Sequence, residues 1–186
     1  KYKIKKKLNI KTIDINDEII HAVNLEKKKL YKQAYNINMK ILKIDPLNPE
    51  VYYNIGNILN SQENYLYAIE MYKKSLLIKQ DFIYCLNNLS NCLQRVRKFD
   101  EAKYYLMQAI RINPSVPVVL DNYASLLKDM HNYKESELFY NKAIICDNTY
   151  VNAHHNLGLL YILQGKFKQG WNEYEWRLKK EDFIKF

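Results

Sequence analysis

The residue types that most often carry out catalysis or bind metal ions are few in this sequence, and their spacing suits neither task. His154 and His155 are adjacent, so on a helix they point to different faces, and neither has another His or Cys at the spacing of a zinc site. Cys85 and Cys92 are seven residues apart, about 10 Å along a helix axis, which is too far for one disulfide bond. We therefore expect no catalytic residue, no metal site and no bound cofactor.

Other catalytic motifs are also absent from the sequence. The acidic pairs, Glu135 with Glu137 and Glu173 with Glu175, diverge on a helix because their members are two residues apart. No glycine-rich phosphate loop and no nucleophile elbow occurs. No apolar run approaches the roughly 18 residues of a membrane span. The three cysteines are too few for a disulfide framework and fit a reducing compartment, so we expect a cytoplasmic protein that binds rather than reacts.

A regularly spaced set of asparagines offers binding chemistry instead. Asn54, Asn88, Asn122 and Asn156 recur every 34 residues, and we call this set the amide column. An asparagine amide carries two N–H donors and a carbonyl acceptor, so it can pair with a peptide bond without reading the neighbouring side chain. Repeats about 10 Å apart would meet about every third residue of an extended peptide. The column predicts a site for an extended peptide; the alternative is that the amides tie adjacent helices together.

Further polar and aromatic side chains project toward the same predicted face. They are Asn57, Asn87, Asn91, Tyr53 and Tyr84. The resulting surface is rich in amides and carries few charges. We expect micromolar or weaker binding there, because each net hydrogen bond contributes about 0.5–1.5 kcal/mol against several kcal/mol of association cost.

The elements that position these residues follow from the same period of 34. An aromatic column comprises Tyr31, Tyr65, Phe99, Tyr133 and Phe167. Small residues form two columns: Ala34, Ala68, Ala102, Ser136 and Gly170, and Ala22, Gly56, Ser90, Ala124 and Gly158. An apolar column comprises Leu25, Leu59, Leu93, Leu127 and Tyr161. Each period therefore predicts two amphipathic helices of about 14 residues that approach closely at the small side chains.

The predicted helices alternate along the chain. First helices are expected near residues 15–28, 49–62, 83–96, 117–130 and 151–164. Second helices are expected near 31–44, 65–79, 99–112, 133–146 and 167–180. With only 4 Gly and 4 Pro the sequence lacks the turn signals of an all-β fold, so we expect an all-α fold. Its repeat units are expected near 15–48, 49–82, 83–116, 117–150 and 151–186.

This pattern resembles the tetratricopeptide repeat. One unit matches the family pattern with Tyr52, Ile55, Gly56, Leu59, Ala68 and Tyr72. The next matches it with Leu86, Leu89, Leu93, Ala102, Leu106, Ala109 and Pro114. Glu18 and His21 occupy apolar columns, which indicates an atypical first unit. The resemblance implies a right-handed superhelix of about five helix-turn-helix repeats, with first helices lining a concave groove for an extended protein or peptide partner.

The C-terminal unit departs from the others with the motif G-W-x-x-Y-E-W-R at residues 170–177. The motif resembles the last repeat of bacterial proteins that run into a glycosyltransferase domain, the O-linked N-acetylglucosamine transferase and SPINDLY-like family. That resemblance implies substrate recruitment for a transferase domain in cis after residue 186. The residues expected to dock such a domain are Trp171, Tyr174, Trp176 and Arg177. The alternatives are aromatics that cap the array, and a stand-alone, non-enzymatic scaffold for complex assembly.

The net charge of +9 lies almost entirely at one end of the chain. Residues 1–43 carry 12 lysines and 4 acidic residues, a net of +8, which leaves +1 for residues 44–186. We expect residues 1–14 to form a lysine-rich, solvated tail ahead of the array at 15–186; contact with phosphate groups or anionic lipid is the alternative. The near-neutral array argues against a nucleic-acid partner. Because the sequence begins with Lys, we expect a fragment or a processed product.

Overall fold

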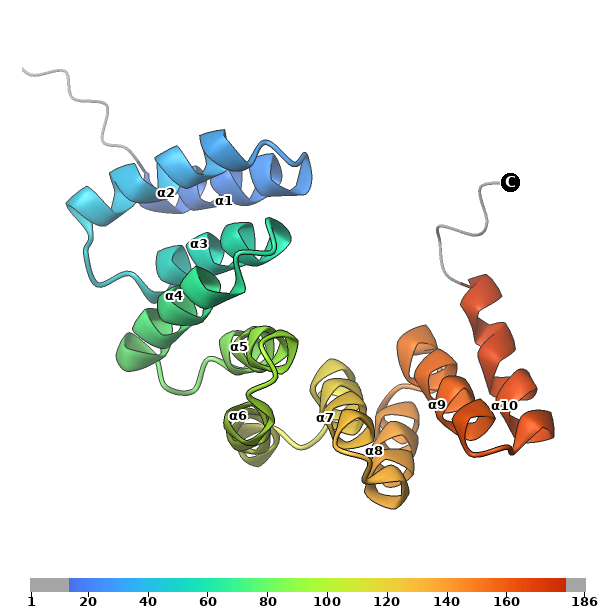
Figure 1. The fold of residues 1–186 in the computed structure, drawn as a ribbon. Helices are drawn as coiled ribbons and strands as arrows, with labels where there is room; N and C mark the ends of the chain where they lie inside the picture. Colours follow the sequence, from blue (N-terminus) through green and yellow to red (C-terminus); the bar gives the residue numbers. More distant parts are fainter. Residues whose placement is uncertain (1–13, 180–186) are drawn as a thin grey trace, which may run out of the picture. The chain divides into compact units, whose positions relative to one another are not determined.

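The computed structural model describes residues 14–179, which fold into five consecutive helical hairpins (Figure 1). All regular secondary structure in that range is helical, which confirms the predicted all-α fold. The tail predicted at residues 1–14 lies, except for Asp14, outside the described residues. The chain divides between Lys79 and Gln80 into two compact units, unit 1 and unit 2.

Unit 1 contains two hairpins. Its helices are α1 (Ile15–Lys27), α2 (Tyr31–Ile44), α3 (Pro49–Ser61) and α4 (Tyr65–Ile78). Each helix packs on the next along the chain, and α1 also contacts α3. The buried core of these hairpins includes Ile19, Ile41, Val51 and Ile55. Burying such side chains contributes about 1.5–3 kcal/mol each, so the apolar columns hold the hairpins together.

Unit 2 contains three hairpins. Its helices are α5 (Ile83–Arg95), α6 (Phe99–Ile112), α7 (Pro117–Asp129), α8 (Tyr133–Cys146), α9 (Val151–Leu163) and α10 (Phe167–Tyr174), followed by the 3₁₀ helix η1 (Glu175–Lys179). The first helices lie in a row, because α5 contacts α7 and α7 contacts α9. Tyr140, Leu157 and Leu160 belong to its buried core. The first helices thus bring residues 34 or 35 apart in sequence into contact.

The turns inside the hairpins share one backbone geometry. Their residues with positive φ are Lys29, Glu63, Arg97, His131 and Gly165, at 60°, 59°, 60°, 61° and 76°. Immediately after each, a backbone N–H donates to the carbonyl of the apolar column, as from Asn64 to Leu59 at 2.9 Å and from Lys166 to Tyr161 at 2.9 Å. This is the Schellman geometry that ends a helix by satisfying its last carbonyls. The turn geometry therefore recurs every 34 residues, as the helices do.

Prolines and asparagines mark helix starts between hairpins. Pro49 and Pro117 occupy the first turns of α3 and α7, where a missing N–H costs nothing. The Asn48 side chain accepts a hydrogen bond from the Val51 N–H at 3.1 Å and so caps α3.

The small columns lie where helices approach most closely, as predicted. Ala34, Ala68 and Ala102 are fully buried. A Cβ added to Gly56 would lie 2.5 Å from the Tyr72 ring, and one added to Gly158 would lie 2.5 Å from the Tyr174 backbone nitrogen. At Gly56 and Gly158 the neighbouring helix therefore leaves no room for a side chain larger than a hydrogen atom.

One predicted boundary was wrong. The last second helix was expected to run from 167 to 180, but α10 ends at Tyr174 and the chain continues as η1. The tighter winding changes the direction of the side chains that follow, and Trp176 there stacks on His154 of α9. The chain therefore leaves the α-helical conformation after Tyr174, where Trp176 packs against α9.

Candidate functional site

Two members of the amide column form hydrogen bonds between neighbouring first helices of unit 2. The Asn122 Nδ2–H on α7 donates to Asn87 Oδ1 on α5 at 2.8 Å. The Asn156 Nδ2–H on α9 donates to Asp121 Oδ1 on α7 at 2.9 Å. In both pairs the donor lies 35 residues after the acceptor. This is the helix-tying role that the sequence had left open as an alternative.

The acceptors form a column of their own, one residue before the amide column. It comprises Asn87 and Asp121 in consecutive repeats. Asn87 also donates through Nδ2 to Asn88 Oδ1 at 3.2 Å, so the amides of α5 and α7 form a short chain of hydrogen bonds. Each amide has two N–H groups and a carbonyl with two lone pairs, so one bond uses only part of its capacity.

A second polar link joins α5 to α7 near their C-terminal ends. The Gln94 Nε2–H donates to Asp129 Oδ2 at 2.7 Å, again with a separation of 35 residues. We use the term amide face for the row on α5, α7 and α9. It comprises Asn87, Asn88, Asn91, Asp121, Asn122 and Asn156.

The electrostatics of the amide face are set by Asp121. This side chain is only 4% exposed, so its carboxylate depends on donors such as Asn156 for compensation. Burial, and then the Asp121 charge, raise the pKa of Tyr150 to about 12. Burial and the same carboxylate raise the pKa of Tyr140 as well. Both phenols therefore stay protonated at neutral pH, and the face holds one buried negative charge among neutral groups.

Other predicted peptide-binding residues of unit 2 differ in exposure. Tyr84, on α5, is 57% exposed. Asn88 and Asn91 are half-buried on the same helix. These three side chains are accessible, whereas Asn87 is buried against its two amide partners.

Unit 1 carries the remaining predicted residues on α3. Asn54 is buried, with 6% exposure. The Tyr72 hydroxyl of α4 donates to Asn57 Oδ1 at 2.8 Å. The Tyr53 ring lies 5.9 Å from the Tyr72 ring, centroid to centroid. In unit 1 Asn57 and Tyr53 therefore contact Tyr72, which itself fills the space left by Gly56.

The aromatic residues predicted to dock a further domain have different environments. Trp171 is 54% exposed. Trp176 is half-buried and stacked on His154, with ring centroids 3.8 Å apart. The Arg177 guanidinium lies 4.3 Å from the centre of the Tyr174 ring and donates to the Tyr174 carbonyl at 3.2 Å. These contacts cap α9 and α10, as the capping alternative expects, and leave Trp171 as the accessible aromatic.

Sequence reasoning missed one polar cluster, around His154. Its Nδ1 lies 2.6 Å from Glu173 Oε2 and its Nε2 lies 3.1 Å from the Asn148 carbonyl oxygen. The only sequence signal was a histidine in a buried column, because Glu173 comes 19 residues later on another helix.

The cysteines and histidines do not form a reactive or metal site in the part of the chain that the structure describes. Cys85 and Cys92 are fully buried, and burial raises the pKa of the Cys92 thiol to about 12. No group of three His, Cys, Asp or Glu within residues 14–179 could hold a metal ion. None of the described helices is long and apolar enough to cross a membrane.

Comparison with known families identifies the repeat. Three family models, each describing a tetratricopeptide repeat, match residues 49–82, 82–113 and 139–171. These matches together cover more than half of the chain.

Two curated relatives each match part of this chain. Protein O-mannosyl-transferase Tmtc3 of Drosophila melanogaster is 28% identical over 127 residues, which are 66% of this chain and 13% of that protein. Protein ycf37 of Cyanophora paradoxa is 35% identical over 92 residues, which are 47% of this chain and 54% of that protein. The chain therefore spans about half of one relative and about an eighth of the other.

Solved structures share the fold. A thermophilic tetratricopeptide protein of Thermus thermophilus superposes with a TM-score of 0.78 at 17% identity, covering 90% of this chain and 92% of that one. YrrB, described as a tetratricopeptide protein with an unusual peptide-binding site, has a TM-score of 0.67 at 19% identity, covering 91% of this chain and 87% of that one. The family matches, the 34-residue columns and the five hairpins show that this chain belongs to the tetratricopeptide repeat family and is a protein-interaction module.

Proposed function

We propose that the chain binds an extended peptide along the amide face, with Asn88, Asn122 and Asn156 contacting the peptide backbone. The observation that carries the proposal is the repetition of Asn122 and Asn156 at one position of consecutive repeats. Each is half-buried and uses an Nδ2–H to hold the neighbouring first helix. The bond fixes the amide plane, so the second N–H and the carbonyl are pre-oriented for a ligand. Helix tying and peptide binding are then two uses of one side chain.

The chemistry of the face favours a neutral backbone over a charged terminus. Its only buried charge is the negative Asp121, which opposes a peptide carboxylate. Repeats that grip a C-terminal carboxylate need fixed cations on adjacent first helices, but Asn87 and Asn122 occupy those positions here. The proposed partner is therefore an internal, extended segment. Tyr84 and Asn91 on α5 contribute accessible contacts beside the amides.

The test uses a peptide selected from a random display library on the full chain. Its affinity is then measured by isothermal titration for the wild type and for the triple variant Asn88→Ala, Asn122→Ala and Asn156→Ala. We expect a loss of at least about tenfold, since several net hydrogen bonds of about 0.5–1.5 kcal/mol disappear. Unchanged affinity would overturn the proposal.

Two controls separate binding from folding. The double variant Asn24→Ala and Asn36→Ala removes exposed amides from α1 and α2 and should bind as the wild type does. Circular dichroism melting of every variant reports whether the helices persist. A version of the selected peptide N-methylated at alternate residues keeps its side chains but loses backbone donors, so backbone reading predicts that its affinity falls.

We further propose that the array recruits substrates for a glycosyltransferase. The support is the G-W-x-x-Y-E-W-R motif, together with the similarity to Tmtc3, which is an O-mannosyl-transferase. Trp171 is the residue through which a following domain would dock, because it is 54% exposed beside the packed Tyr174. Sequencing the gene beyond the codon for Phe186 tests this. An in-frame transferase domain whose activity on the selected peptide falls on Trp171→Ala supports it, whereas absence of such a domain leaves the stand-alone scaffold.

A further inference from the structure

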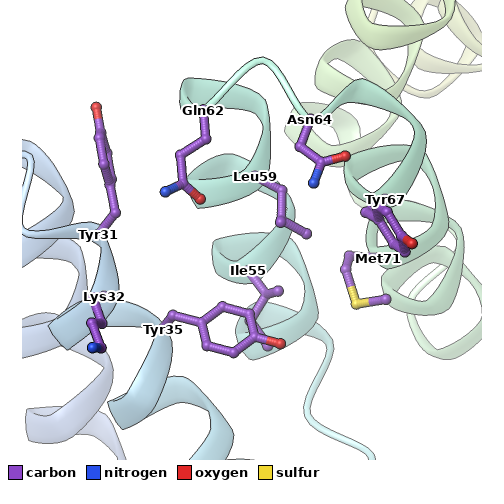
Figure 2. A pocket seen from close by; sticks show the side chains of 9 residues that line it. All are labelled: Tyr31, Lys32, Tyr35, Ile55, Leu59, Gln62, Asn64, Tyr67 and Met71. Carbon is purple, nitrogen blue, oxygen red and sulfur yellow. The ribbon is translucent and has the colours of Figure 1, made fainter.

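Unit 1 holds a pocket that is separate from the amide face. It lies between α2 and α4, over the C-terminal half of α3, and has a volume of about 450 Å³. Figure 2 shows Tyr35 of α2 reaching across toward Ile55 of α3, with Tyr67 and Met71 of α4 on the opposite side. Its size falls in the range of about 300–1,000 Å³ that is usual for ligand sites.

The wall of this pocket is aromatic and apolar. Tyr31, Tyr35 and Tyr67 supply three rings, and Leu59 and Met71 supply aliphatic surface. Tyr35 is 37% exposed and Tyr67 is 60% exposed, so large ring surfaces face solvent. Tyrosine and methionine are enriched at the cores of protein interfaces, and tyrosine buries much area at low entropic cost. The wall therefore suits an apolar anchor side chain of a partner.

Glu63 is exposed in the turn before α4, whereas the α2 side of the pocket is positively charged. Lys32 lines it, and Lys32 forms no ion pair with a carboxylate of residues 14–179. Residues 27–44, which include α2 and the turn before it, contain six lysines and no acidic residue. On α4, Glu70 is already paired with Lys74 at 2.8 Å. The charge beside the pocket thus favours acidic groups in the occupant.

The tyrosines of the pocket are not a general feature of the repeat. In the other units the position of Tyr35 holds Ile69, Lys103, Glu137 and Trp171, so a second aromatic occurs there but no second tyrosine. The position of Tyr67 holds Gln33, Glu101, Glu135 and Gln169. The repeats therefore share a scaffold here, but only the α2 and α4 pair combines two tyrosines at these positions.

We propose that this pocket is a second binding site, which takes an acidic peptide carrying an apolar anchor side chain. The anchor enters between the Tyr35 and Tyr67 rings, and the flanking carboxylates face Lys32. The site is independent of the amide face, because its residues lie on α2, α3, α4 and the turn between α3 and α4, whereas the amide face lies on α5, α7 and α9. A partner that also contacts the amide face would bind through two sites of modest affinity.

The probe is a short fluorescein-labelled peptide in which Trp-Leu is flanked on each side by an Asp and a Glu, titrated with the full chain by fluorescence anisotropy. We expect saturable binding that weakens with added salt. Tyr35→Ala and Tyr67→Ala should each weaken it at least about tenfold, as expected for aromatic anchors. Lys32→Glu should weaken it about threefold to tenfold.

Matched variants and peptides make the result decisive. Lys40→Glu reverses an exposed charge on α2 about 12 Å along the axis from Lys32 and should change affinity less than about twofold. Tyr35→Phe keeps the ring and should bind as the wild type does. A peptide with Gly-Gly in place of Trp-Leu, and one with Lys in place of the acids, should both fail to bind. The altered side chains are exposed, so melting curves should stay unchanged.

Several outcomes would overturn the proposal. One is equal loss in Lys32→Glu and Lys40→Glu, which would indicate nonspecific attraction; another is wild-type binding by Tyr35→Ala. A third is a concentration-dependent dimer in sedimentation that Tyr35→Ala dissociates while the peptide does not bind, since the occupant is then a second copy. The triple variant Asn88→Ala, Asn122→Ala and Asn156→Ala should bind this probe normally. Failure of the amide-face experiment therefore leaves this one intact.

Discussion

The imidazole ring of His154 lies flat on the indole ring of Trp176, with centroids 3.8 Å apart and planes within 3° of parallel. Glu173 and the Asn148 carbonyl hold the two ring nitrogens of the histidine, which fixes the plane on which the indole stacks. This contact joins α9 to η1 and closes the C-terminal end of unit 2 within the described residues. The prediction is that Trp176→Ala lowers the free energy of unfolding by about 2 kcal/mol, through lost stacking and burial.

Urea unfolding followed by circular dichroism measures this loss. Trp171→Ala is the matched control, because Trp171 is 54% exposed and should cost less than about 1 kcal/mol. Equal losses in both variants would mean that the stack on His154 contributes nothing beyond ordinary aromatic contact.

The glycines should differ in their tolerance of alanine. Gly158→Ala places a Cβ 2.5 Å from the Tyr174 backbone nitrogen and 2.9 Å from the Gly170 carbonyl oxygen, and backbone atoms cannot rotate away. Gly165→Ala meets nothing within 4 Å and carries only the cost of its φ of 76°. We expect a loss of about 2–3 kcal/mol for Gly158→Ala and about 1 kcal/mol for Gly165→Ala. Thermal melting ranks the two, and the reverse order would contradict the close contact.

The three thiols should react at very different rates. Cys146 is exposed, whereas Cys85 and Cys92 are fully buried. Burial raises the pKa of Cys92 to about 12, so at pH 8 almost none of it is thiolate. Iodoacetamide labelling of the native protein, read by peptide mass spectrometry, should modify Cys146 alone. In denaturant all three should react, and rapid native labelling of Cys92 would show that α5 opens.

The hydrogen bond between Asn156 and Asp121 should have a measurable coupling energy. Asn156→Ala removes a donor from a carboxylate that is 4% exposed, at a cost of about 1–3 kcal/mol. Asp121→Ala removes the buried charge together with its need for a donor, so the double variant should cost less than the sum of the single ones. A double-mutant cycle from urea unfolding gives the coupling energy. Asn36→Ala, at an exposed position of α2, should leave the free energy of unfolding unchanged. Strict additivity would show that the bond does not stabilise the α7 and α9 pair.

Much of the fold could be predicted from the sequence because the same residue pattern occurs in five consecutive units. Small columns such as Ala68 and Ala102 predict close contacts, and both residues are fully buried. The predicted helix bounds agree with the structure to within two residues everywhere except at α10. The end of α10 was predicted wrongly because the contact between His154 and Trp176 is not part of the 34-residue repeat pattern.

The candidate sites could be predicted less completely. The amide column was visible as a spacing, but the acceptor one residue earlier in the preceding repeat was not. A 35-residue separation predicts a hydrogen bond only when the rotation of each first helix about its axis, and its shift along that axis relative to the next first helix, are known. The pocket beside Tyr35 and Tyr67 was missed for a related reason. These residues are 32 apart and occupy different columns, so no regularity linked them.

By itself, then, the sequence determined the repeat, the helices, their turns and the placement of small side chains, because each depends on local periodicity and on excluded volume. Only the tertiary structure decided which partners the polar side chains take. Asn122 reaches Asn87, His154 reaches Glu173, and Tyr35 faces Tyr67 across a pocket, because helix packing sets those distances. A hydrogen bond forms only within a few tenths of an ångström of its usual donor–acceptor distance, and periodicity does not fix atomic positions that precisely.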